Sequence, residues 1–487
     1  MRQLFLLLFS LFVHSGLYAQ GMNFDDASYE KVPQKYLAQA TASAALPARV
    51  DLSPYAPSVM HQGKFGTCVG FASAYYGRTI LEAVSRGITD RAKIDSLSFS
   101  PSFLYNAIKD STDSNCQNGS LIDTAMIYMR EIGVARFSEK GYRDCNPNDP
   151  QLARADSRIM DYVRLFDLGD KQGSVVVATK KALAEMTPVI IAFQTTPSFN
   201  HLGFFGQIWR WIKRLFGGED ESGLWKPADS NKRSTGHAVC VVGYDDNKFG
   251  GAFKIVNSYG KDWGEDGYFW MTYPDYNEYT KYGYQAYLPI APDSAGVTMA
   301  GRVSVQFATF VTDNEVPYER NVEGKTNQGN ENQEGMVAYK LRDAQRSGSS
   351  YKFVTEVDRG AYIYILAGSS SDPSITTLFP VSDKISPHIG ANTTMLLPSE
   401  SLHYKLDNVV GTEYWLFLFS KNALNIEHYL CEMKKVQGNF TNRALTAFGE
   451  DLVPYEKVEY DNRKVNFTLR GQQEGHIVPL LISLEHK

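Results

Sequence analysis

Cysteine, histidine and asparagine occur in this sequence in an order that favours catalysis by a thiol nucleophile. Cys68 stands where a segment with helical spacing begins, so its thiol would meet the unpaired amide groups of a helix N-terminus. Such groups lower the pKa of a thiol and favour the reactive thiolate. His237 precedes one apolar run and Asn257 follows another. An imidazole beside the thiol would act as base and then acid, and the Asn carbonyl would orient the ring.

A fourth residue completes this candidate catalytic group. Gln62 lies shortly before Cys68, and its side-chain amide could donate to a developing oxyanion together with the backbone N–H of Cys68. Each of these residue types, taken alone, usually has a structural role. The argument therefore depends on their combination.

Helical patterns come first in the chain and strand patterns later. We expect a helix from Cys68 that runs through Phe71–Arg86 and stops at Gly87, because Gly suits the left-handed end of a helix. Two further helices are expected over Leu121–Ile132 and Val176–Met186. Short runs rich in β-branched and aromatic residues predict strands at Val189–Phe193, Ala238–Tyr244, Ala252–Val256 and Tyr268–Thr272.

The C-terminal part has a different pattern, with short alternating runs that predict a separate all-β domain at 298–487. Its clearest expected strands are Val303–Val311, Tyr362–Leu366 and Tyr414–Phe419, and the polar segment Asn321–Glu334 is expected to be a loop. Its histidines are too scattered to predict a metal site. We expect no metal and no cofactor. Cys431 is expected to be a buried thiol.

Composition limits the classes of partner. The 487 residues exceed what one hydrophobic core usually holds, so two or three domains are expected. A net charge of −5 provides no global basic field, which makes nucleic acid an unexpected partner. Five cysteines are too few for a disulfide scaffold, and an odd number leaves at least one free thiol.

The N-terminus predicts export. A basic residue, an apolar run from Leu4 to Val13 and small residues up to Ala19 are typical of a signal peptide at 1–19. The run is too short to span a membrane, and no later run is long enough, so we expect no transmembrane segment in the mature chain and a periplasmic or extracellular location. Residues 20–45 are expected to be a short, loosely held leader, which could at most lie as a strap through the cleft.

Residues 46–292 resemble a papain-like (cathepsin-type) cysteine peptidase, because several separate motifs occur in the order typical of that family. Leu46–Asp51 resembles the mature N-terminus of that family, and Gln62–Ser73 resembles the block around its nucleophile. The blocks around His237 and Asn257, the latter with Trp263, complete the resemblance. It implies an α+β papain-like fold, with a helical subdomain and an antiparallel β-barrel-like subdomain, followed by the separate all-β domain.

The resemblance also implies the roles of individual residues. Cys68 would be the nucleophile, His237 the base, Asn257 the orienting residue and Gln62 the oxyanion donor, and the substrate would be a peptide or protein. The sequence Cys116–Gly119 resembles the turn along which the family lays the substrate backbone. The residues expected to bind substrate are Gly66, Thr67, Asn118, Gly119 and Trp263.

Departures from the family pattern concern the surroundings of these residues. Val69 and Tyr259 stand where the family usually has Trp, so aromatic shielding of the His–Asn hydrogen bond would depend more on Trp263. Phe65 replaces the usual half-cystine. With Cys68 kept for catalysis, we expect Cys116 and Cys145 to pair, because both stand in polar, loop-like segments of an exported protein.

An insertion precedes His237, since its distance from Cys68 exceeds the roughly 130 to 150 residues typical of the family. Within it, Leu202–Phe216 has a strongly amphipathic helical pattern with Arg and Lys on the polar face. Three interpretations are open: packing on the peptidase core, contact with a membrane surface, or a lid beside the cleft.

Three functions are compatible with these residues. The first is an exported bacterial peptidase that acts through an acyl-enzyme thioester. The second is a non-catalytic papain-like scaffold that binds peptides, and the third is acyl transfer to an amine. Part of the C-terminal region, from Tyr351 to Pro380, resembles a small bacterial domain of unknown function often attached to catalytic modules, and this accessory domain could bind another protein.

Overall fold

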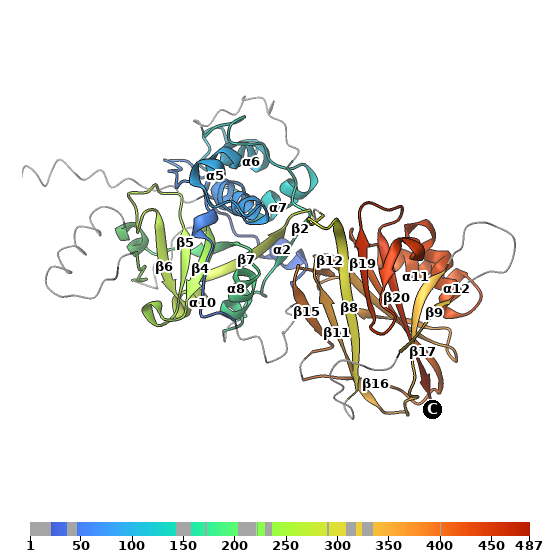
Figure 1. Cartoon of the computed structure of the whole chain (residues 1–487). Coiled ribbons are helices and arrows are strands. Elements are labelled where there is room, and N and C mark those ends of the chain that lie inside the picture. The colour runs from blue at the N-terminus through green and yellow to red at the C-terminus, as the bar shows by residue number, and fades with distance from the viewer. Residues whose placement is uncertain are drawn as a thin grey trace, which may run out of the picture. The chain divides into compact units, whose positions relative to one another are not determined.

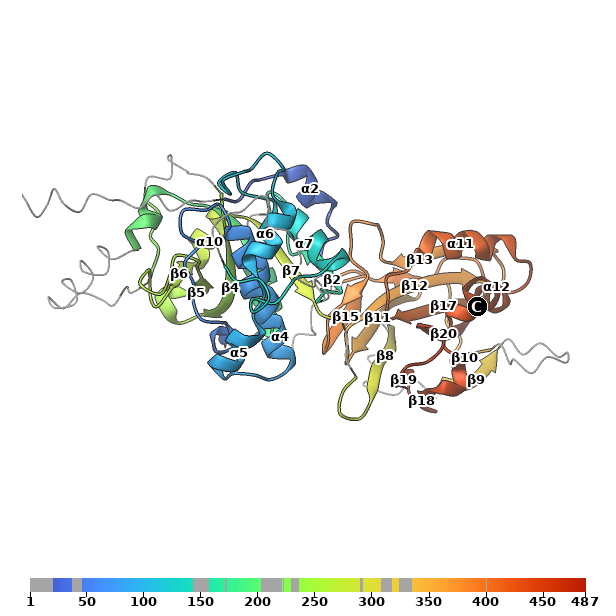
Figure 2. The same cartoon turned by 90° about the horizontal axis from the view of Figure 1, so that it is seen from above.

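The computed structural model of the chain describes residues 21–36, 46–142, 157–170, 173–202, 221, 223–228, 236–289, 292–307, 318–323, 335–399 and 401–487. The chain divides into two compact units (Figures 1 and 2). One consists of Met1–Val32 with Leu46–Leu288, and the other of Pro33–Ala45 with Pro289–Lys487. The segment predicted as one leader is therefore shared between the two units.

A buried helix carries Cys68 in the first unit. It begins as α3 (Cys68–Gly70), continues through a π-helical stretch, η2 (Phe71–Arg78), and ends as α4 (Thr79–Ser85). Its residues from Cys68 to Ala83 are all buried, which suits a helix surrounded by other elements. Gly87 then adopts a positive φ of 62°, so the predicted helix and its glycine stop are confirmed. The other helices of this unit are α2 (Asp26–Lys31), α5 (Arg91–Leu97), α6 (Pro101–Ile108), α7 (Ile122–Glu131), α8 (Ser174–Ala184) and α10 (Tyr273–Tyr279).

The first unit also contains a seven-stranded sheet in which every described strand pair is antiparallel. The strand order is β2-β7-β3-β4-β5-β6, and β1 pairs with β4. All four predicted strands of this region are confirmed, two of them with the same bounds, because a buried β-branched and aromatic run has few alternatives to a sheet. The strands are β1 (Arg49–Asp51), β2 (Asp161–Arg164), β3 (Val189–Gln194), β4 (Gly236–Asp245), β5 (Ala252–Val256), β6 (Tyr268–Thr272) and β7 (Thr280–Tyr287).

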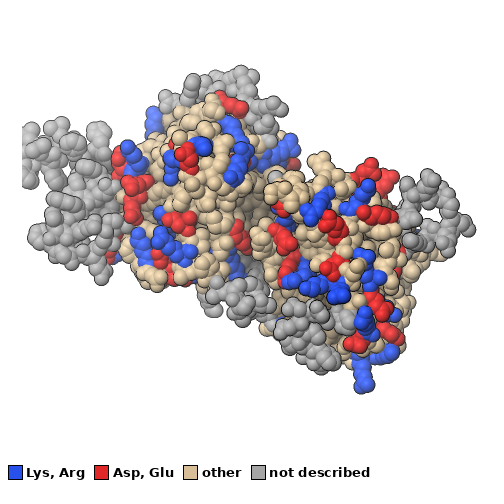
Figure 3. All heavy atoms as spheres, in the orientation of Figure 1, with Lys and Arg blue, Asp and Glu red and all other residues tan. Residues whose placement is uncertain are grey.

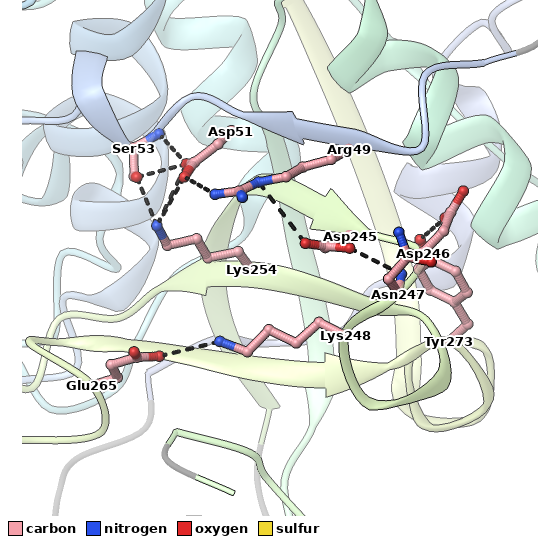
Figure 4. Close-up of polar contacts among 10 residues, drawn as sticks. All are labelled: Arg49, Asp51, Ser53, Asp245, Asp246, Asn247, Lys248, Lys254, Glu265 and Tyr273. Carbon is pink, nitrogen blue, oxygen red and sulfur yellow. Dashed lines mark hydrogen bonds and ion pairs between the residues drawn. The ribbon is translucent and has the colours of Figure 1, made fainter. Parts of the chain in front are cut away.

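Ion pairs and hydrogen bonds hold the short strand β1 against β4 and β5 (Figure 4). The Lys254 Nζ atom lies 3.2 Å from Asp51 Oδ2 and 2.7 Å from Ser53 Oγ. Arg49 lies 3.9 Å from Asp245 across the strand pair. These side chains are partly exposed, so each pair adds little stability, but together they specify the register of β1.

The second unit is a β-sandwich. One sheet has the strand order β13-β12-β17-β20-β10-β9 with β14 on β12, and the other has β15-β11-β8-β19-β18 with β16 on β11. Both sheets contribute to one core, in which Phe353 of β11 lies edge-on to Trp415 and Phe417 of β17. The strands are β8 (Val297–Phe307), β9 (Tyr318–Glu323), β10 (Met336–Leu341), β11 (Ser350–Val357), β12 (Ala361–Ser369), β13 (Ile375–Phe379), β14 (His388–Ile389), β15 (Thr393–Leu397), β16 (Tyr404–Lys405), β17 (Gly411–Ser420), β18 (Val458–Tyr460), β19 (Asn466–Arg470) and β20 (Ile477–His486).

This unit is β-rich, but the expectation of an all-β domain is wrong, because it also contains two helices that the strand patterns did not indicate, α11 (Ile426–Lys435) and α12 (Phe440–Phe448). The expectation of a buried thiol at Cys431 is wrong, because that residue is exposed. Helix α11 turns Leu430 and Met433 inward, and this helical phase directs Cys431 toward solvent.

Charges are mixed over the surface. On the face drawn in Figure 3, Lys and Arg side chains lie among Asp and Glu side chains over both units. Among the described residues, no helix is both long and apolar enough to cross a membrane.

Candidate functional site

The structure places Cys68 beside the strand that carries His237. Cys68 is 0% exposed, and its thiol is within hydrogen-bonding reach of the backbone of Ala238 and of Gly21. His237 and Ala238 are consecutive residues near the start of β4. The fold thus brings the predicted nucleophile and the predicted base together from segments far apart in the sequence.

Asn257 orients the His237 ring. The Nε2 atom of His237 lies 2.8 Å from Asn257 Oδ1, and both side chains are buried. The Asn257 oxygen also accepts the backbone N–H of Ser258. The other ring nitrogen of His237, Nδ1, is buried and has no hydrogen-bond partner among the described residues. One ring nitrogen is thus held by Asn257, and the other is left without a partner among the described residues.

Aromatic rings enclose the His237–Asn257 pair. Tyr259 contacts the imidazole directly, with ring centroids 5.1 Å apart, and Phe199 lies 5.8 Å away. Trp263 packs on Phe199 and Tyr259 and is 1% exposed. Tyr259 at the position of the family's usual Trp therefore contributes to the shielding itself, in addition to Trp263. The predicted role of Trp263 in substrate binding stays a prediction.

Gln62 is fixed by a residue that the sequence analysis missed. Ser258 Oγ donates to Gln62 Oε1 at 2.5 Å, and Gln62 Nε2 donates to the carbonyl of Phe65 at 2.8 Å. The backbone N–H of Gln62 also donates to the carbonyl of Ser258. The hydroxyl directly after Asn257 is the sequence signal that could have indicated this positioning role, because one loop then sets both Asn257 and Gln62.

The N-terminal leader lies across this site. The Gly21 carbonyl accepts from the Ser120 N–H at 2.9 Å, and the Asn23 N–H donates to the Ser120 carbonyl at 3.0 Å. The Asn23 side chain donates to the Asn118 carbonyl, and Met22 forms a bridge with Gly236. We call residues 21–23 the strap. It contacts the turn predicted to hold the substrate backbone.

Glycines allow this close approach. A Cβ atom added to Gly21 would overlap the backbone of Gly66, and one added to Gly119 would overlap the backbone of Gly21. One added to Gly236 would come 2.6 Å from the Met22 carbonyl. Two of these glycines, Gly66 and Gly119, are predicted substrate-binding residues. Thr67 lies beside them and shares a hydrogen bond with Tyr142.

The expectation of a loosely held leader is wrong for residues 21–36. Helix α2 begins at a capping Asp25, and its Tyr29 is 0% exposed. The Tyr29 hydroxyl donates to the Phe166 carbonyl at 2.7 Å and accepts the Gly283 N–H, and its ring stacks on Tyr282 at 4.4 Å. A buried, hydrogen-bonded aromatic side chain is a strong anchor. The leader composition hid this anchor because a single tyrosine makes no periodic pattern.

Comparison with known proteins identifies a family for part of the chain. The sequence model described as "Papain family cysteine protease" matches residues 219–288, which include His237 and Asn257. The chain carries a papain-family cysteine protease region. A second match, "Domain of unknown function (DUF4384)", covers residues 345–423 of the β-sandwich.

Individual relatives match the papain-family region. Cathepsin L of Sarcophaga peregrina is 27% identical over 222 residues, which are 44% of this chain and 54% of that protein. Procathepsin L of Rattus norvegicus is 26% identical, over 43% of this chain and 55% of that protein. The chain thus spans about half the length of these curated relatives. Among solved structures, xylellain, a cysteine protease from Xylella fastidiosa, is 22% identical with a TM-score of 0.41, over 56% of this chain and 97% of that one.

Burial sets the charge state of the papain-family site. It raises the pKa of Cys68 to about 11, although nearby backbone amides act in the opposite direction. The expectation of a lowered thiol pKa is therefore wrong for this conformation, because desolvation outweighs the helix N-terminus. Burial also lowers the pKa of His237 to about 4, against the opposing effect of its hydrogen bond to Asn257. With the strap in place, thiol and imidazole are both neutral near pH 7.

This predicts a measurable pH dependence. The folded pKa of His237, about 4, lies below its ordinary value of 6.5, so the unfolded chain binds more protons between these two pH values. The free energy of unfolding should therefore fall as the pH decreases from 6.5 to 4, by on the order of 3 kcal/mol from this group. An NMR titration of the imidazole, assigned with His237→Gln, should give a midpoint near 4. A midpoint near the ordinary value would contradict a desolvated ring.

The cysteines of the papain-family region suggest a second measurement. Cys116 is disulfide-bonded, whereas Cys68 and Cys240 are free and buried. Cys145, the partner that we predict, lies outside the described residues. Non-reducing peptide mapping is expected to recover Cys116 and Cys145 in one linked pair of peptides. A loop of about 30 residues closed in this way would add about 3 kcal/mol of stability in the chain-entropy model. Recovery of both as free thiols would refute the pairing.

Two other features of the chain bear on function. The first is a group of potential metal ligands, Asp407, Glu413 and His486, whose ligand atoms lie within 4.8 Å of one another. His486 Nδ1 lies 3.0 Å from Glu413, and its Nε2 lies 3.0 Å from Ser347 Oγ. Both ring nitrogens of His486 therefore already have partners.

The second feature is the amphipathic segment Leu202–Phe216. Its first residue, Leu202, accepts a hydrogen bond from the Gly264 N–H, beside Trp263. The remaining residues of this segment, up to Phe216, lie outside the described residues.

Proposed function

We propose that this protein is an exported cysteine peptidase that hydrolyses peptide bonds through an acyl-enzyme thioester on Cys68. The observation that supports this most strongly is the buried Nδ1 of His237, which has no hydrogen-bond partner among the described residues while Asn257 holds the opposite ring nitrogen. A purely structural histidine in a dry core would be expected to use both nitrogens.

The proposed reaction uses these residues as follows. His237 removes the proton of the Cys68 thiol, and the thiolate sulfur bonds to the carbonyl carbon of the substrate. The Cys68 N–H and the Gln62 amide stabilise the oxyanion. The C–N bond then breaks, and His237 returns the proton to the leaving amine. Water next attacks the thioester with His237 as base, which releases the carboxylic acid and restores the thiol.

The alternative is a non-catalytic scaffold that binds peptides in the papain-family region. The strap and the raised pKa of Cys68 favour it in the conformation described, because a neutral, covered thiol is inert. Acyl transfer to an amine would use the same residues as hydrolysis, and product analysis with added amines would separate it from hydrolysis.

Thiol labelling tests the proposal against the scaffold. We would label Cys68 with iodoacetamide at pH 5.5 in a Gly21→Ala chain, whose strap is expected to be displaced, and in the same chain with His237→Ala. An ion-paired thiolate predicts rapid labelling in the first chain and slow labelling in the second. Equal labelling rates in both chains, which increase only when the pH approaches the ordinary pKa of a thiol, would reject an activated nucleophile. Profiling of the Gly21→Ala chain on a peptide library, with Cys68→Ala as control, would then define its substrates.

Export is part of this proposal and has its own test. The signal-like segment before Gln20 supports it. N-terminal sequencing of protein recovered outside the cytoplasm is expected to start at Gln20, which would keep the strap intact. Recovery of the chain in the cytoplasm with residues 1–19 attached would contradict export.

A further inference from the structure

The leader continues from the papain-family unit into the β-sandwich unit, where it pairs with a loop. The Gln34 N–H donates to the Lys384 carbonyl at 2.7 Å, and the Ser386 N–H donates to the Gln34 carbonyl at 2.9 Å. These two bonds form a parallel bridge between Gln34 and Ile385. The backbone of the leader is thus bound as a short added strand.

The two residues after Gln34 reinforce this binding. The Tyr36 hydroxyl lies 2.7 Å from the Leu396 carbonyl and 3.0 Å from the Pro398 carbonyl. Its ring lies edge-on to Phe379, at 5.2 Å between centroids, and packs against the sandwich core. Lys35 is 7% exposed, which is unusual for a lysine.

Backbone pairing along an extended segment, with a socket for a particular side chain, is the general form of peptide recognition by strand addition. We propose that the β-sandwich unit is a peptide-binding module, that its ligand here is Pro33–Tyr36, and that this binding keeps the strap in the cleft. The consequence for activity rests on the proposed peptidase function, but the binding itself does not.

The continuous chain of the leader links the strap to the segment that the sandwich binds. Tyr29 anchors α2 in the first unit, and the Arg164 guanidinium donates to the Val32 carbonyl at 2.7 Å, directly before the segment that the sandwich binds. Two anchors on one short stretch of chain bind with a high effective concentration, so the loss of one weakens the other. A sandwich that releases Tyr36 would therefore let the strap leave the cleft more often.

Hydrogen exchange of the full chain tests the coupling. The experiment uses a Cys68→Ala background, so that no proteolysis interferes, and compares Tyr36→Ala and Tyr36→Phe with the parent. We expect Tyr36→Ala to speed exchange of the Gln34 and Asn23 amides by about tenfold or more, because it removes both the hydroxyl bonds and the ring packing. Tyr36→Phe, which keeps the ring, should give a smaller increase at both amides.

Tyr429→Ala is the matched control. Tyr429 is also partly buried in the sandwich unit, where its hydroxyl bonds to Asp451 and its ring stacks on Phe448. Tyr429→Ala should leave the hydrogen-exchange rates of the Gln34 and Asn23 amides unchanged. Unaltered amides in β12 would confirm that the sandwich stays folded in each variant, and Tyr36→Phe provides the test should Tyr36→Ala not fold.

The possible outcomes separate the parts of the proposal. Faster exchange at Gln34 with an unchanged rate at Asn23 would overturn the coupling, and an unchanged rate at both would overturn the binding of Tyr36. A chain that shows coupled exchange but no peptidase activity after Gly21→Ala would reject the proposed function and leave the binding module in place.

Discussion

Cys68→Ala is expected to abolish peptide hydrolysis, with a loss of about 10⁴-fold or more in kcat/KM, because no other group can form the thioester. His237→Ala should cost a similar factor, since the thiol would lose both its base and the acid for the leaving amine. Asn257→Ala should leave a measurable remainder, because an orienting residue exchanges no proton. Peptide hydrolysis measured in the Gly21→Ala background, where the cleft is expected to be open, compares the three variants.

Cys240→Ala is the control for loss of a buried thiol. Cys240 is also free and 0% exposed in β4, and burial raises the pKa of its thiol well above the ordinary range. Its removal is expected to leave kcat/KM unchanged, apart from a modest loss of stability. Full activity in Cys68→Ala would contradict the assignment of the nucleophile, whereas equal losses in both variants would indicate a general effect of core packing.

Gly21→Ala is expected to open the cleft. The added methyl group would overlap the Gly66 backbone. Movement of the strap would break its bonds to Ser120, and movement of Gly66 would strain its bond to the Cys116 carbonyl. A penalty of about 3 kcal/mol, at the upper end for overpacking, favours the open form by about 100-fold. The rate of Cys68 alkylation by iodoacetamide at pH 7 should rise by that factor, since exposure also removes the desolvation that raises the thiol pKa.

Gly141→Ala is the matched control, because a Cβ atom added there would lie 4.0 Å from the Phe137 carbonyl oxygen and would meet no closer neighbour among the described residues. It should leave the alkylation rate of Cys68 unchanged. Mass spectrometry identifies the labelled residue, which separates Cys68 from the exposed Cys431. An unchanged rate at Cys68 in Gly21→Ala would show that the strap does not limit access to the thiol.

The sequence by itself determined several of the elements and the candidate residues. The strands β5 and β6 have the bounds predicted from their apolar runs, and the helix from Cys68 ends at the glycine expected to stop it. These features are local, because residue type and spacing encode periodicity and turn geometry within a few positions. The order of Cys68, His237 and Asn257 was also visible in the sequence, and the resemblance to the papain family depended on it.

Only the tertiary structure decided the state of the site. The strap, the anchor at Tyr29 and the bond from Ser258 to Gln62 join segments far apart in the sequence, and none has a local pattern. The pKa of Cys68 illustrates the difference. A helix N-terminus, visible in the sequence, lowers a thiol pKa, but burial raises it here, and burial depends on the whole fold.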